Sequence, residues 1–130
     1  MTMFADLDLA RQHHAALKQL FSRQFGETAD YRALRRVLEL CQAAAQAVDD
    51  EYCRQKLRLV GEYAAELLAG SSSHAKWGRE SMSGAEFLRL QVLNALELFA
   101  SRLYSIEALR RAGKTEDQLP WKTRSSFAPT

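Results

Sequence analysis

Apolar residues recur at three- and four-residue spacing along most of the chain, which is the pattern of helices with one buried face. The pattern predicts four helices, over residues 6–25, 29–48, 50–69 and 84–112. Proline is excluded from helix interiors, and the first proline is Pro120. We therefore expect an all-α single-domain bundle over residues 1–113, with its four helices antiparallel.

Residues at the predicted helix ends support these boundaries. Gly26 is placed to end the first helix, since glycine adopts the left-handed conformation cheaply. Thr28 is a suitable N-cap for the second helix, with Asp30 in its first turn. Ser83 and Glu86 form a capping box that opens the last helix.

The apolar stripe shifts by one position between the second and third segments. The stripe of the second contains Leu34, Leu38, Cys41, Ala45, Val48 and Tyr52, and that of the third contains Cys53, Leu57, Val60, Ala64 and Leu67. One position turns a helix by about 100°, so a single helix would carry the stripe off its face. The shift falls at Asp49, Asp50 and Glu51, which resemble an N-cap and an acidic first turn. A break is favoured here, and one continuous helix over 29–69 is the alternative.

The first helix has a regular apolar stripe, whereas the last is apolar over most of its circumference. The stripe of the first consists of Leu7, Ala10, His14, Leu17 and Phe21. In the last helix only a narrow polar stripe interrupts the apolar residues, so neighbours must cover several of its sides. The helix at 84–112 is therefore the central helix of the bundle, the interface of a homodimer, or both.

The segment 114–130 differs in composition from the rest of the chain. It holds both prolines, several Ser and Thr residues, and few apolar anchors, among them Trp121. It cannot bury enough apolar surface to offset the entropy of ordering it. We interpret it as a C-terminal tail or docking arm.

Composition excludes several classes of protein. The 130 residues include 18 Lys and Arg and 16 Asp and Glu, a net charge of +2, which by itself implies neither nucleic acid nor an anionic membrane. No apolar run is long enough to span a membrane, and the first ten residues lack the features of a signal peptide. Cys41 and Cys53 occupy apolar helical positions, typical of reduced buried thiols. We therefore expect a cytoplasmic protein with no membrane partner.

No arrangement of residues indicates catalysis. The spacings of zinc sites, di-metal sites, nucleophile elbows and phosphate loops are all missing from the sequence. His14 fits a packing position at the edge of the first stripe better than a ligand or acid–base role. We expect no catalytic residue, no metal site and no cofactor.

The candidate partner-binding residues are tryptophans and arginines, which are common in interface anchors. They are Trp77 and Arg79 between the last two helices, Arg32, Arg35 and Arg36 in the second helix, Arg110 and Arg111 at the end of the last helix, and Trp121. The predicted function is non-enzymatic protein–protein interaction, as an adaptor, chaperone-like or regulatory protein. The alternative is a nucleic-acid-associated regulator that uses its arginine-rich helix faces.

Overall fold

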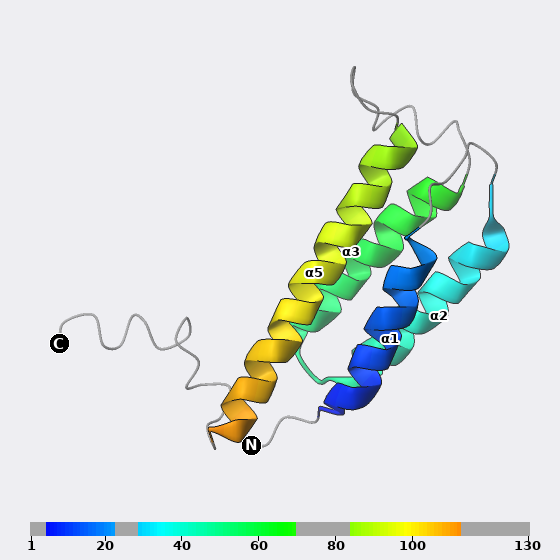
Figure 1. Cartoon of the computed structure of the whole chain (residues 1–130). Coiled ribbons are helices and arrows are strands. Elements are labelled where there is room, and N and C mark those ends of the chain that lie inside the picture. Colours follow the sequence, from blue (N-terminus) through cyan, green and yellow to red (C-terminus); the bar gives the residue numbers. More distant parts are fainter. Residues whose placement is uncertain (1–4, 23–28, 70–83, 113–130) are drawn as a thin grey trace.

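The computed structural model is a bundle of helices, shown in Figure 1, and the structure describes residues 5–22, 29–69 and 84–112. Within these ranges the helices are α1 (Leu7–Leu20), α2 (Tyr31–Ala47), α3 (Glu51–Leu68) and α5 (Gly84–Arg111). The predicted all-α bundle of four helices is confirmed. The predicted arm at 114–130 lies outside the described residues.

The helices form a ring in which each packs against its neighbours in antiparallel orientation (Figure 1). α1 packs on α2, α2 on α3, α3 on α5, and α5 closes the ring against α1, with the most extensive contact between α3 and α5. Hydrogen bonds mark the opposed ends: the Asp30 amide donates to the Leu68 carbonyl over 3.0 Å, and the Asp6 amide donates to the Ala47 carbonyl over 2.7 Å. The antiparallel arrangement is therefore confirmed.

Aspartates begin three of the helices. The carboxylate of Asp6 accepts a hydrogen bond from the amide of Leu9 (3.1 Å). Asp30 and Asp50 do the same for the amides three residues further on, each over 3.0 Å. Each bond satisfies an amide that the first turn of a helix leaves without a partner.

These caps settle two of the predicted boundaries. The break at Asp50 is confirmed, so residues 29–69 form two helices and not one. The prediction that Thr28 caps the second helix is wrong, because Asp30 supplies the capping carboxylate and the helix begins at Tyr31. The first helix ends at Leu20, five residues before the predicted end.

The predicted apolar stripes of α1 and α3 face the core, but that of α2 is partly wrong. Residues 53, 57, 60, 64 and 67 of α3 are all buried, as is the α1 stripe apart from the half-buried His14. In α2 the core instead takes Val37, Leu40, Ala44 and Ala47, whereas Leu38 is 47% exposed. The physical reason is that α2 carries apolar residues on two sides. One side points to the centre of the bundle, and the other lies along its outer seam with α3.

Two neighbours cover α5 along most of its length. Ten of its residues are buried, among them Leu96, Phe99 and Leu103, and α1 and α3 pack on either side of it. Leu90 is 39% exposed and Tyr104 is 72% exposed. The wide apolar surface of the helix is thus largely buried within one chain, and a dimer through it stays a prediction.

Candidate functional site

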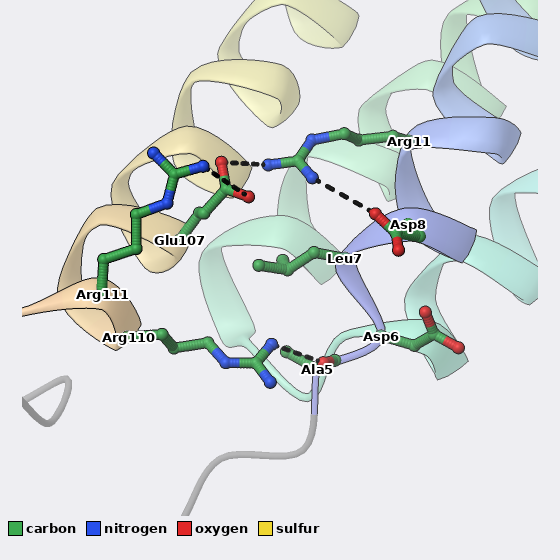
Figure 2. Close-up of a pocket in the computed structure, with 8 residues that line it drawn as sticks. All are labelled: Ala5, Asp6, Leu7, Asp8, Arg11, Glu107, Arg110 and Arg111. Carbon is green, nitrogen blue, oxygen red and sulfur yellow. Dashed lines mark hydrogen bonds and ion pairs between the residues drawn. The ribbon is translucent and has the colours of Figure 1, made fainter. Parts of the chain in front are cut away.

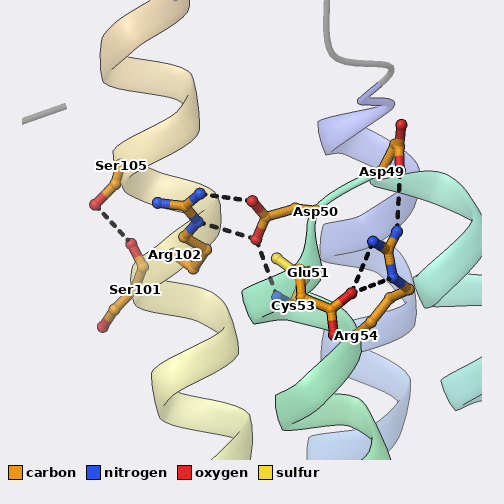
Figure 3. Close-up of polar contacts among 8 residues, drawn as sticks. All are labelled: Asp49, Asp50, Glu51, Cys53, Arg54, Ser101, Arg102 and Ser105. Carbon is orange, nitrogen blue, oxygen red and sulfur yellow. Dashed lines mark hydrogen bonds and ion pairs between the residues drawn. The ribbon is translucent and has the colours of Figure 1, made fainter. Parts of the chain in front are cut away.

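A buried ion pair joins the turn between α2 and α3 to α5 (Figure 3). The guanidinium of Arg102 donates from Nε to Oδ2 of Asp50 over 3.0 Å, and from Nη2 to Oδ1. The side chains are 5% and 1% exposed, respectively. Oδ2 also accepts the amide of Cys53, so one carboxylate caps α3 and binds α5. This contact is structural, because its charged atoms are closed to solvent.

The environment of Asp50 favours its charged form. Burial raises the pKa of the carboxyl group, but hydrogen bonds from Arg102 and from Cys53 lower it by more, so the pKa lies below its ordinary value. Sequence reasoning found Asp50 only as a helix cap. Its partner is 52 positions away, and the available signal was that Arg102 falls in the buried register of α5.

The predicted arginines at the end of α5 border an open cleft between the start of α1 and the end of α5 (Figure 2). The cleft has a volume of about 520 Å³. Arg110 donates to the carbonyl of Ala5 over 2.8 Å, and Arg111 lies 3.6 Å from Glu107. Arg11 lies 2.7 Å from the same Glu107.

Opposite charges balance each other within this cleft. Its lining includes three arginines and three carboxylates, namely Arg11, Arg110, Arg111, Asp6, Asp8 and Glu107. Each of the three arginines bonds to a carboxylate or a carbonyl of the chain itself. These contacts therefore join the start of α1 to the end of α5, and the cleft presents little net charge to a ligand.

The structure separates the other predicted candidates. Arg32, Arg35 and Arg36 are exposed on the first half of α2, at the opposite end of the bundle from Arg110 and Arg111 (Figure 1). The two groups therefore do not merge into one basic patch. The remaining candidates Trp77, Arg79 and Trp121 lie outside the described residues.

An apolar groove runs along the outer seam between α2 and α3, with a volume of about 530 Å³. From α2 it is lined by Leu38, Cys41, Gln42 and Ala45, and from α3 by Arg54, Leu57, Arg58, Gly61, Glu62 and Ala65. Leu38 is an exposed large apolar side chain on this seam. Its Cδ2 would lie 3.4 Å from a Cβ atom at Gly61, which is van der Waals contact, so the leucine packs directly beside this glycine.

The charged residues along the groove differ in how firmly they are held. Arg54 is bound by Asp49 and Glu51, each with a contact of 2.9 Å (Figure 3). Arg58 and Glu62 are exposed, and neither forms an ion pair with another residue in the described part of the chain. The groove thus has an apolar floor and one cation and one anion available to a partner.

The groove contains no evident nucleophile. Cys41 lies in its floor, and burial raises the pKa of this thiol to about 12. The thiol therefore stays protonated near neutral pH and behaves as a small apolar group.

His14 lies between α1 and α5. Its ring centroid is 6.1 Å from that of Phe99, and burial, with the charge of Lys18, lowers the pKa of the imidazole. No group of three or more potential metal ligands occurs among residues 5–22, 29–69 and 84–112. The histidine is half-buried and packs beside Phe99 at the edge of the core.

Comparison with known proteins adds no functional information. No protein family, no curated protein and no solved structure matches the chain. Among the helices that the structure describes, none has the length and apolar character needed to cross a membrane. The groove between α2 and α3 is the more apolar of the two open cavities described above.

Proposed function

We propose that the protein is a non-enzymatic cytosolic interaction module whose α2–α3 groove receives an amphipathic helix. The observation that carries this proposal is Leu38, a leucine 47% exposed along an apolar groove on a folded bundle. Fully burying a leucine contributes about 1.5–3 kcal/mol, so a partner that covers the exposed half of Leu38 gains about 1 kcal/mol. Laying the apolar face of a helix in such a groove is a common mode of recognition.

The composition of the groove suits a helix. Ala45, Gly61 and Ala65 line it, and their small side chains let a partner's backbone come near the floor. Arg58 and Glu62 stand at its edge with no ion pair in the described part of the chain, so they can orient a partner by charge. The small residues and the two charges together support binding of a specific partner, which an apolar surface alone would not select.

Site-specific photocrosslinking in the cells that produce the protein tests this proposal. A benzophenone amino acid at Gln42, within the groove, should form a discrete adduct, and Leu38→Asp in the same chain should abolish it. The matched control carries the benzophenone at Gln12, an exposed position on α1, and should form no such adduct. Absence of a groove-specific adduct would overturn the proposal.

A second candidate function is binding to nucleic acid through α2. It is supported by the exposure of Arg32, Arg35 and Arg36 on one half of that helix. Binding of this kind weakens steeply with salt, because phosphate contacts release counterions. Retention on heparin that falls with salt and is lost when the three arginines become glutamine would favour this candidate. Retention unchanged by the substitutions would exclude it.

A further inference from the structure

A contact between α2 and α3 marks one position along the length of the groove, which is called its level below. Leu38 of α2 lies over Gly61 of α3, with Cδ2 3.4 Å from the position of a Cβ atom there. Both residues line the groove, and the leucine is among the exposed large apolar residues. A partner at this point therefore meets the apolar side chain of Leu38, next to the position on α3 where Gly61 has no side chain.

Two opposite charges bracket this level on α3. Arg58 stands three positions before Gly61 and Glu62 one position after it, so the two charges are one helical turn apart. Both side chains are exposed and neither is bound in an ion pair within the described residues. The midpoint between the two charges is Val60, next to Gly61.

This arrangement is complementary to itself. A two-fold axis at this level, perpendicular to the helices, sets α3 antiparallel to α3 of a second copy. Arg58 of each copy then faces Glu62 of the other, and the two Leu38 side chains meet beside the axis. A two-fold interface requires such reciprocity, because the same patch serves both partners. Resting on the proposed function, we infer that the partner helix is α3 of a second copy of this chain, packed antiparallel against the α2–α3 face that holds the groove.

The size of the face places this dimer among small interfaces. α2 has 17 residues and α3 has 18, so each is about 25 Å long. Two adjacent helices are about 20 Å wide, which gives roughly 500 Å² on each copy and about 1,000 Å² in total. This area is at the lower limit for a specific interface. Weak, transient complexes have interfaces of this size, and we expect a dissociation constant in the micromolar range.

Sedimentation equilibrium of the purified full chain between about 1 and 500 µM tests the inference. The mass should rise from the 14.7 kDa of one chain toward twice that value. Leu38→Glu should abolish the rise, since it places two carboxylates together at the axis. Leu90→Glu on the outer face of α5 is the matched control, because Leu90 is 39% exposed but lies outside the groove.

A charge-reversal cycle tests the reciprocal pairs directly. Arg58→Glu or Glu62→Arg alone replaces two attractions with two repulsions and should weaken association at least about tenfold. The double variant restores opposite charges and should return within about threefold of the natural chain. Both residues are exposed, so the cycle decides the question even if Leu38→Glu fails to fold.

The remaining outcomes overturn the inference in distinguishable ways. A mass that stays at one chain up to 500 µM excludes the dimer. If the Gln42 adduct then joins a different protein, the proposed function survives and only the identity of the partner is wrong. A dimer that is lost in Leu90→Glu and kept in the groove variants forms through α5 and not through the groove.

Discussion

Replacing Arg102 with methionine tests the buried ion pair that links α5 to the start of α3. Methionine keeps a long unbranched side chain in the helix and removes the guanidinium that donates to Asp50. The side chain of Asp50 is only 1% exposed, so water cannot replace the lost donors without a local opening. The carboxylate would keep the hydrogen bond from the Cys53 amide but lose its counter-charge.

The expected loss is large compared with the stability of a domain. Breaking a buried pair by removing one partner costs about 3–5 kcal/mol, because a charge is left uncompensated. The free energy of unfolding of a domain is about 5–15 kcal/mol, so Arg102→Met should remove a large fraction of the stability. For a chain of this size the melting temperature should fall by about 10 °C or more. Urea unfolding followed by circular dichroism measures the free energy directly.

A double-mutant cycle separates the ion pair from the helix cap. Asparagine is as good an N-cap as aspartate, so Asp50→Asn keeps the cap and removes the charge. If the pair accounts for the loss, the double variant Asp50→Asn with Arg102→Met should be much more stable than the sum of the single losses predicts. A coupling energy near zero, or a loss under about 1 kcal/mol for Arg102→Met, would refute the reasoning.

The same carboxylate should make the stability depend on pH. Because the folded pKa of Asp50 is below its ordinary value, its contribution is complete above the unfolded pKa. It is lost as the pH falls through the folded pKa, that is, below about 4. The difference in unfolding free energy between the natural chain and Asp50→Asn should therefore shrink as the pH falls from about 5 to about 3. A difference that stays constant there would show that Asp50 is not the titrating group.

Three further substitutions test the core, the groove and the edge of the core by the same unfolding assay. Phe99→Ala, at a fully buried site, should cost about 3–5 kcal/mol, whereas Leu90→Ala, at an exposed site of the same helix, should cost far less; similar losses would contradict the packing. Gly61→Ala should stabilise the monomer by about 0.5–1 kcal/mol through helix propensity, since the new Cβ meets only the movable end of Leu38 at 3.4 Å; a net loss would show that the seam has no room. Burial lowers the pKa of His14, so the unfolded state binds a proton first and stability declines as the pH falls below about 6.5. His14→Gln should flatten that decline, and an unchanged slope would exclude the histidine as its cause.

Local chemistry explains why the helices themselves could be predicted. The apolar spacing of α3 and the acidic residues before it are signals within a few positions, and both correspond to the observed helix and its cap at Asp50. The error at α2 has a different origin. Leu38 and Leu40 are both apolar, and the sequence alone does not tell which of them faces the centre of the bundle. That choice depends on the positions of α1 and α3, which are tertiary information.

The candidate sites show the same limit. No residue near Arg102 in the sequence indicates that Asp50 is its partner, because only the packing of the helices brings the two residues together. Its signal was its position between Phe99 and Ile106 in a buried three- and four-residue register. A charge in such a register predicts a buried partner but does not identify it. The groove could not be predicted at all, since it is formed by two helices whose outer seam depends on how α2 is rotated.

The polar contacts that fasten α5 and the surface proposed for binding occupy different parts of the bundle. Three polar contacts from α5 tie down one end of the bundle, through Arg102 to Asp50, Glu107 to Arg11, and Arg110 to the Ala5 carbonyl. The groove lies along the outer seam of α2 and α3 and contains none of these residues. Substitutions at Arg58 and Glu62 should therefore change association without changing the unfolding free energy of the monomer. Variants at Arg102 should show the reverse pattern, and this contrast makes each set of measurements a control for the other.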